Sequence, residues 1–143
     1  MTCKGVAIVT GGSRGIGRAT ALKLGQAGYT VVVNYVSKPA AADAVVDQIR
    51  KAGGMAAAVA GDVAREADVL ALFAAADRLG PLTVLINNAG VMDAQARLDE
   101  MSLDRLTRLF NINLLGSFLC AREAVKRMST AHGGKGGVIV NQS

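Results

Sequence analysis

The sequence is poor in aromatic residues, which make up only 3% of its 143 positions, and it contains two cysteines. Cys3 and Cys120 are too few and too far apart to indicate a disulfide framework or a metal site. No stretch reaches the length of about 18 apolar residues that a membrane-spanning helix needs. A single lysine precedes the first short apolar run, so the N-terminus does not resemble a secretory signal. We therefore expect a cytoplasmic protein with no membrane association and no metal.

Basic residues outnumber acidic ones, 16 to 11, which gives a formal net charge of +5. Such an excess can indicate a protein that binds nucleic acid. Here, however, the basic residues never form a run longer than two, and no aromatic residues alternate with them to stack on bases. The charge is interpreted as a solvated surface, and no nucleic-acid partner is expected.

Hydrophobic residues make up 51% of the chain, enough for one domain with a buried core. Short apolar runs alternate with helical patterns, which is typical of a parallel sheet built from βαβ units. Strands are expected at 6–9, 30–34, 55–60, 83–87 and 138–141, and helices at 18–26, 37–52, 66–79 and 103–128. This order predicts an α/β fold.

Apolar spacing also predicts which side of a helix faces the sheet. The first helix would turn Ile16, Ala19, Thr20, Leu22 and Leu24 inward. The last helix would bury Leu106, Phe110, Asn113, Ser117 and Ala121, with Leu103, Leu114, Phe118 and Val125 beside them. Cys120 is interpreted as core filling, and His132, in a glycine-rich loop, as a surface residue.

A glycine-rich segment, Thr10–Gly17, lies between the first expected strand and the first expected helix and reads TGGSRGIG. Backbone N–H groups at the start of a helix point outward unpaired and carry partial positive charge, so this position suits a phosphate. Glycine allows the sharp turn and lets a pyrophosphate approach where a Cβ atom would block it. A tight turn without any ligand is the alternative.

Three further motifs are expected close to this turn. Asp62-Val63 follows the third strand, Asn87-Asn88-Ala89-Gly90 follows the fourth, and Asn113-Leu-Leu-Gly116 lies in the long helix. Ligands of open α/β sheets bind at the carboxyl ends of the strands. Together, the motifs therefore indicate a dinucleotide-binding site.

In the order and spacing of TGxxxGxG, DV, NNAG and NxxG, the sequence resembles the short-chain dehydrogenase/reductase family, in its branch of ordinary chain length, from Lys4 to Ser143. The resemblance implies that the pyrophosphate and adenosine ribose are held by Gly11, Ser13, Arg14, Gly15, Ile16 and Gly17. It implies that the adenine amine binds Asp62 beside Val63, and that Asn88, Ala89 and Gly90 lie under the ribose and nicotinamide. Asn113 resembles the family's helix asparagine, which anchors a water in the proton relay, and is the one catalytic residue expected here.

Each polar residue of these motifs also has a structural interpretation. Asp62 could cap the following helix. Asn87 and Asn88 could satisfy turn backbone, since asparagine tolerates such conformations. Asn113 could be a structural amide whose hydrogen bonds are all made within the protein.

The segment after the second strand indicates which cofactor is used. NAD enzymes place an acidic residue about 20 positions after the glycine turn to bind the ribose hydroxyls, whereas residues 34–38 here read NYVSK. Arg14 with Ser37 or Lys38 could instead bind a 2′-phosphate, which suits the fork of an arginine. NADP(H) is therefore favoured over NAD(H), and Asn34, Tyr35 and Ser37 are further candidate contacts.

The family's chemistry also needs a serine, a tyrosine, and a lysine four residues after the tyrosine. A phenol with a pKa of about 10 is a poor base until nearby positive charge lowers that pKa. Neither Tyr29 nor Tyr35 is followed by that lysine, and the serine would fall one position past Ser143. Residues 1–143 are therefore expected to be the N-terminal, NAD(P)-binding part of a longer single-domain enzyme, inactive alone, with a sheet incomplete on its C-terminal side.

We predict a Rossmann-type doubly wound parallel sheet with strand order 3-2-1-4-5. The complete protein is expected to transfer a hydride between NADP(H) and a small carbonyl or alcohol substrate. By the same resemblance, it is expected to form a homodimer or homotetramer through the long helix. Two alternatives stay open: a non-catalytic dinucleotide-binding fragment or regulatory domain, and an extended-type epimerase or dehydratase, which normally spaces its glycines as TGxxGxxG.

Overall fold

The computed structural model describes residues 2–143. These residues form a five-stranded sheet in the order β3-β2-β1-β4-β5, with every neighbouring pair of strands parallel. The strands are β1 (Val6–Val9), β2 (Thr30–Tyr35), β3 (Met55–Ala60), β4 (Leu82–Asn87) and β5 (Val138–Asn141). The predicted doubly wound sheet and its strand order are confirmed.

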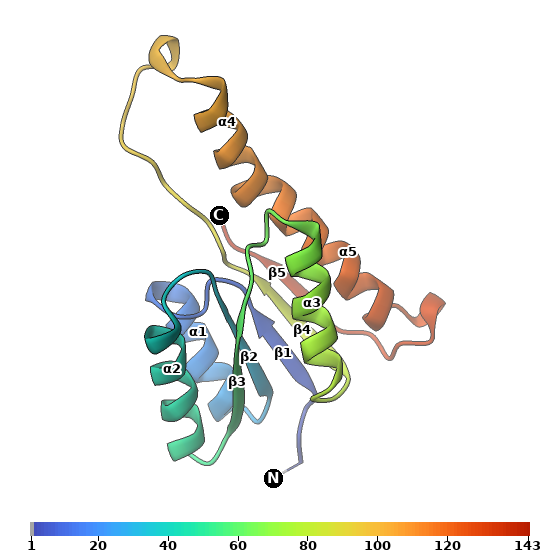
Figure 1. The fold of residues 1–143 in the computed structure, drawn as a ribbon. Helices are drawn as coiled ribbons and strands as arrows, with labels where there is room; N and C mark the ends of the chain where they lie inside the picture. The colour runs from blue at the N-terminus through green and yellow to red at the C-terminus, as the bar shows by residue number, and fades with distance from the viewer. Residues whose placement is uncertain (1) are drawn as a thin grey trace.

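Helices cover both faces of this sheet (Figure 1). Helices α1 (Gly15–Gln26) and α2 (Pro39–Lys51) lie on one face, and α3 (Glu66–Asp77) and α5 (Gly116–Met128) lie on the other. Helix α4 (Leu103–Phe110) continues through a π-helical segment, Asn111–Leu115, into α5. Short 3₁₀ turns occupy Leu98–Glu100 and Thr130–His132. None of the helices in residues 2–143 is long and apolar enough to cross a bilayer.

Each face of the sheet has its own hydrophobic cluster, because side chains alternate along a strand. In β1, Val6 and Ile8 pack in the cluster under α3 and α5, whereas Ala7 and Val9 pack in the cluster under α1 and α2. All four residues have no exposed surface. A strand covered on both faces reads as a continuous apolar run, which is why the sequence predicts β1 and β2 well.

The inward face of α1 differs from the prediction. Its buried residues are Gly17, Ala21 and Gly25, whereas Ile16 is 64% exposed. A Cβ atom on Gly25 would lie 2.8 Å from Ile49 Cγ2 of α2, so the two helices approach each other where α1 has no side chain. Of the other residues predicted to face inward, Ala19 is exposed and Thr20, Leu22 and Leu24 are half-buried. The prediction was wrong because it counted large apolar residues, whereas the closest contacts use small ones.

The long helical segment also differs from the prediction. No residue of α4 is buried, and α5 buries Gly116, Cys120, Glu123, Ala124 and Met128. Asn113, predicted in the buried row, is exposed, and Leu106, Ser117 and Ala121 are half-buried. Five apolar residues predicted to lie at or beside that row are exposed as well, and we call them the apolar stripe: Leu103, Phe110, Leu114, Phe118 and Val125. The predicted burial of Cys120 and exposure of His132 are confirmed.

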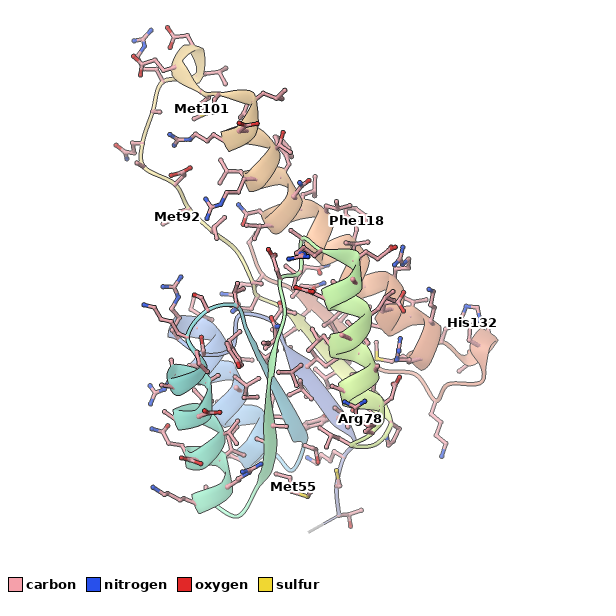
Figure 2. The ribbon with its side chains drawn as sticks, viewed as in Figure 1. Met55, Arg78, Met92, Met101, Phe118 and His132 are labelled. Carbon is pink, nitrogen blue, oxygen red and sulfur yellow. The ribbon has the colours of Figure 1, made fainter. Side chains whose placement is uncertain are left out.

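Helix α4 and the loop that precedes it extend away from the sheet (Figure 1). Met92 and Met101 mark this projecting loop in Figure 2, and Phe118 marks the following helix. Met92 is 97% exposed. The molecule therefore has a sheet with helices on both faces and a helical segment that projects from it.

Candidate functional site

All five strands end at one edge of the sheet because they run parallel, and the predicted motifs follow these ends. The glycine turn follows β1, Gly61 and Asp62 follow β3, and the segment 88–90 follows β4. Thr10 and Ala89, 79 positions apart in the chain, are joined by a hydrogen bond of 2.9 Å. The fold thus brings the turn and the NNAG segment into direct contact.

Two polar side chains tie the glycine turn to the end of β4. The buried Thr10 Oγ1 accepts hydrogen bonds from the N–H groups of Asn88 (3.0 Å) and Ala89 (2.9 Å) and donates to Ile86 O (3.3 Å). Asn88 Nδ2 donates to the carbonyl oxygens of Thr10 and Gly11, both at 3.0 Å. The amide of Asn88 therefore shapes the turn itself.

The turn leaves open space in front of the N-terminus of α1. Gly15 has a φ of +55°, which favours glycine, and a Cβ atom there would meet nothing within 4 Å. Gly17 lies so close to Gly11 O and Asn88 Nδ2 that a Cβ atom would overlap both. The first turn of α1 has no acidic residue, and its N-cap, Arg14, makes no capping hydrogen bond. The helix N–H groups are therefore available to an anion such as pyrophosphate.

The side chains predicted to bind a 2′-phosphate lie at the same edge. Arg14 and Lys38 are the N-cap residues of α1 and α2, neighbouring helices that pack on the same face of the sheet. Both side chains are exposed, as is Ser37, and Tyr35 is half-buried at the end of β2. Neither Arg14 nor Lys38 takes part in an ion pair within residues 2–143. The N-termini of α1 and α2 thus each carry an exposed cation that is not paired with an acidic residue of residues 2–143.

Asn34 is placed differently from the other candidates, because it is only 1% exposed. Its Oδ1 accepts from Gly11 N at 3.2 Å, and its Nδ2 donates to Val59 O at 3.3 Å and to Gly61 O at 3.0 Å. Its backbone oxygen accepts from Gly12 N at 2.9 Å. The side chain of Asn34 therefore binds the backbone that surrounds the site.

Asp62 is half-buried in the turn between β3 and α3. Its Oδ1 accepts from Ala64 N at 2.9 Å, and its N–H donates to Asp68 Oδ2 at 2.9 Å. The N-cap of α3 is Arg65, so Asp62 stabilises the turn and does not cap the helix. Its second carboxylate oxygen makes no hydrogen bond within residues 2–143 and is available to a ligand.

Asn113 lies in the π-helical segment and is exposed. Its Oδ1 accepts from Val91 N and its Nδ2 donates to Val91 O, both at 2.8 Å. These two bonds hold the start of the projecting loop, just after Gly90, against the helix. At the other end of the NxxG motif, a Cβ atom on Gly116 would lie 2.6 Å from Val63 Cγ2, so this glycine lets the helix contact the buried Val63.

Sequence reasoning missed the role of two buried polar residues, Thr10 and Asn87. Asn87 Nδ2 donates to Ser117 O at 3.2 Å and to Asn141 Oδ1 at 2.9 Å, so it joins β4 to α5 and to the end of β5. Thr10 lies just after an apolar run, and Asn87 lies at the last position of another. A polar residue at such a position was the available signal, since buried polar groups need hydrogen-bond partners.

No cluster of three or more His, Cys, Asp or Glu side chains in residues 2–143 is arranged to hold a metal ion. The two tyrosines lie at opposite edges of the sheet, because Tyr29 precedes β2 and Tyr35 ends it. The ammonium group of Lys4 lies 5.9 Å from the centroid of the Tyr29 ring. Tyr29 is therefore remote from the edge that carries the glycine turn.

Comparison with known proteins decides the family. A family model described as short chain dehydrogenase matches residues 5–143. The chain belongs to this family. The chain is 50% identical over 139 residues to an uncharacterized oxidoreductase, YgfF, of Escherichia coli (strain K12), an alignment that covers 96% of this chain and 56% of that protein. The family predicted from the motifs is confirmed.

Two further relatives have more specific names. The short-chain dehydrogenase is 42% identical over 123 residues to glucose 1-dehydrogenase 2 of Bacillus subtilis (strain 168), covering 85% of this chain and 48% of that protein. The chain is 38% identical over 143 residues to the chloroplastic NADPH-dependent aldehyde reductase 2 of Arabidopsis thaliana. This alignment covers 91% of this chain and 53% of that protein. The chain thus spans about half the length of the curated relatives it matches.

A solved structure agrees with the fold. A mutant of a Serratia marcescens short-chain dehydrogenase/reductase matches with a TM-score of 0.88 at 33% identity, over 97% of this chain and 55% of that one. The Rossmann-type arrangement and the family are therefore supported independently by sequence and by structure.

Proposed function

We propose that this short-chain dehydrogenase serves as an oxidoreductase that transfers a hydride between NADP(H) and a small carbonyl or alcohol substrate. The observation that carries the proposal is the glycine turn. Gly15 faces open space at the N-terminus of α1, where N–H groups meet no acidic side chain. Glycine keeps that space clear of a side chain, as a bound pyrophosphate requires.

In this proposal each motif has a defined task. Ser13, Gly15 and Ile16 line the pyrophosphate and adenosine ribose, and Gly11 and Gly17 allow the turn its shape. Asp62 and Val63 receive the adenine, while Ala89 and Gly90 form the floor under the nicotinamide ribose, fixed by Asn88. Asn113 holds the adjoining loop through Val91. The bound nicotinamide would supply or accept the hydride.

The preference for NADP(H) rests on Arg14 and Lys38, which are exposed at adjacent helix N-termini and lie outside every ion pair of residues 2–143. A guanidinium binds phosphate through two parallel hydrogen bonds. The name of the Arabidopsis relative, an NADPH-dependent aldehyde reductase, supports both the cofactor and the carbonyl substrate. The name of the glucose dehydrogenase supports an alcohol substrate.

The test is a fluorescence titration with NADPH and with NADH. We expect Arg14→Ala to weaken NADPH binding about tenfold, the effect of losing one charge-assisted contact, and to leave NADH binding within about twofold. Arg18→Ala is the matched control, because that arginine donates to Gln48 Oε1 of α2 at 3.0 Å. Tighter binding of NADH than of NADPH would overturn the cofactor preference, and binding of neither would overturn the proposed function.

We further propose that residues 1–143 are the cofactor-binding part of a longer single-domain enzyme and have no turnover by themselves. Neither tyrosine in the sequence is followed four positions later by lysine. Val138 and Val140 on β5 are 56% and 44% exposed, on the face that α1 and α2 cover elsewhere, which supports a sheet completed by further elements. Robust NADPH-dependent carbonyl reduction by the 143-residue chain would contradict this.

The apolar stripe supports the proposal of a homodimer or homotetramer that pairs through the long helical segment, because contiguous exposed apolar residues mark interaction surfaces. We also propose that the complete protein is located in the cytoplasm.

A non-catalytic dinucleotide-binding domain is the second candidate function. The complete protein would then bind NADPH without turning over any carbonyl or alcohol substrate. The glycine spacing TGxxxGxG and the match to the short chain dehydrogenase model disfavour an extended-type epimerase.

A further inference from the structure

Asn34 lies where three segments of the candidate site meet. It belongs to β2, its Oδ1 contacts the glycine turn, and its Nδ2 contacts the backbone at the end of β3. Three hydrogen bonds use both polar atoms of a side chain that is almost completely buried. Such a residue can influence a ligand only through the backbone it holds.

We propose that Asn34 is a positioning residue for the adenosine half of the cofactor: its buried amide fixes the glycine turn relative to the end of β3 without itself touching the ligand. The inference rests on the proposed function, since it presumes that a dinucleotide occupies this edge. It also explains why an asparagine follows three valines near the end of β2.

Asn34 determines which N–H groups of the turn face a ligand. The first two glycines of the turn both donate to it, Gly11 to the side-chain oxygen at 3.2 Å and Gly12 to the backbone oxygen at 2.9 Å. Both N–H groups therefore point into the protein. The turn is left to offer a phosphate only its later N–H groups, from Ser13 to the start of α1.

The same side chain sets the other wall of the adenosine site. Nδ2 binds Gly61 O, and the next residue is Asp62, the proposed partner of the adenine amine. The backbone also joins these segments, since Gly61 N donates to Tyr35 O at 2.9 Å and Gly12 N to Asn34 O at 2.9 Å. The amide of Asn34 is the side chain that links the adenine wall directly to the pyrophosphate turn.

Only an amide of this length satisfies all three partners. Leucine has a similar branched shape but carries bulkier methyl groups in place of the amide oxygen and nitrogen, so it would leave Gly11 N–H and two carbonyl oxygens buried without partners. Aspartate would keep an acceptor for Gly11 but place a second oxygen against Val59 O and Gly61 O, where a donor is needed. Leucine therefore releases both sides of the junction, whereas aspartate releases only the side at the end of β3.

The experiment is calorimetric titration of the full chain with 2′,5′-ADP, which contains the adenosine and 2′-phosphate of NADP. We expect Kd to rise about tenfold or more in Asn34→Leu and in Asn34→Asp, as expected for a lost hydrogen bond. Amide hydrogen exchange at Gly11, followed by NMR, should become fast in Asn34→Leu and stay slow in Asn34→Asp. If Asn34 had a structural role alone, the two variants would be less stable but would not combine a higher Kd with this difference in Gly11 exchange.

Leu72→Ala is the control, because Leu72 is 1% exposed in the hydrophobic cluster under α3 and α5. It should lower the unfolding midpoint yet leave Kd within about twofold and Gly11 exchange slow, when all variants are measured fully folded. If Asn34→Leu does not fold, Asn34→Ser replaces it. An unchanged Kd in a folded Asn34 variant, or fast Gly11 exchange in the unchanged protein, would overturn the inference. No binding of 2′,5′-ADP or NADPH to the unchanged protein would instead overturn the proposed function.

Discussion

Helices α4 and α5 are joined end to end but lie in different surroundings. Helix α5 packs on β4 and α3 and buries five residues, whereas α4 buries none and projects with its loop from the sheet (Figure 1). Apolar residues recur at helical spacing in both. The difference teaches that such a pattern identifies an apolar face but not what covers it.

Ion pairs add a second difference between the two helices. Glu123 of α5 is buried and contacts Arg122, Lys126 and Arg127 at 3.1, 2.8 and 3.3 Å. Arg127 also pairs with Asp77 of α3 at 2.8 Å. Helix α5 is thus held to α3 by both packing and charge, whereas the ion pairs of α4 are made with its own preceding loop, from Arg105 and Arg108 to Asp93.

The largest expected effect compares two phenylalanines. Phe73 of α3 has no exposed surface and packs in the cluster that receives α5, whereas Phe110 of α4 is 60% exposed. We expect Phe73→Ala to lower the free energy of unfolding by about 4 kcal/mol and Phe110→Ala by less than about 0.5 kcal/mol. Urea unfolding followed by circular dichroism measures both.

The same pair of variants tests the proposed role of the apolar stripe. If a second copy covers it, Phe110→Ala weakens self-association in sedimentation experiments, and Phe73→Ala leaves self-association of the folded protein unchanged. A large loss of stability for Phe110→Ala in a strictly monomeric sample would show that α4 is covered within the chain. Helices α4 and α5 would then no longer differ in being covered by the rest of the chain.

An intermediate effect is expected at the glycine turn, which hydrogen bonds join to the end of β4. Thr10→Val keeps the shape of the side chain but leaves Ala89 N–H without its acceptor and Asn88 N–H with only Ile86 O, at 3.1 Å. We expect the free energy of unfolding to fall by about 2 kcal/mol and NADPH binding to weaken. Thr107→Val, on the exposed surface of α4, is the matched control and should change stability by less than about 0.5 kcal/mol. Equal losses of stability in Thr10→Val and Thr107→Val would contradict the expected difference between the buried turn and the exposed surface of α4.

The smallest effect concerns the charge that holds α5. Burial acts to raise the pKa of Glu123, but hydrogen bonds from Lys126, Arg122 and Arg127 outweigh it and lower that pKa below its usual value. A carboxyl with a lowered folded-state pKa stabilises the fold above its unfolded pKa of about 4.3. That contribution is lost as the pH falls through the folded-state pKa.

Glu123→Gln should therefore be less stable than the unchanged protein by about 1 kcal/mol at neutral pH, and the difference should vanish as the pH falls below the lowered folded-state pKa of Glu123. Urea unfolding at several pH values measures it. Glu100→Gln, on the exposed loop before α4, serves as the control and should show no such convergence. A difference that persists in acid would mean that Glu123 acts through shape and not through charge.

Much of the fold could be predicted because its elements carry local signals. The bounds of β3 and β5 agree with the predicted 55–60 and 138–141, because each is a short apolar run bounded by turn residues. The glycine turn was predictable because only glycine permits its shape. The family motifs then placed β1, β3 and β4 around one edge.

The rest depends on neighbours that are distant in the chain. Nothing in the local pattern of α1 shows that Gly25 will meet Ile49, so the larger Ile16 was placed inside. The three partners of Asn34 lie 23 to 27 positions away, and a sequence cannot show that its amide would be fully used. The π-helical segment around Asn113 has no periodicity of its own to reveal it.

The placement of Tyr29 and Tyr35 at opposite edges of the sheet has a spectroscopic consequence. The chain has no tryptophan and only these two tyrosines, so its near-ultraviolet emission comes from two known points. Tyr35 ends β2, beside the residues proposed to hold the 2′-phosphate, whereas Tyr29 lies near Lys4 at the far edge. Replacing Tyr29 with phenylalanine would leave Tyr35 as the one tyrosine. Its fluorescence would then report ligand binding at the end of β2.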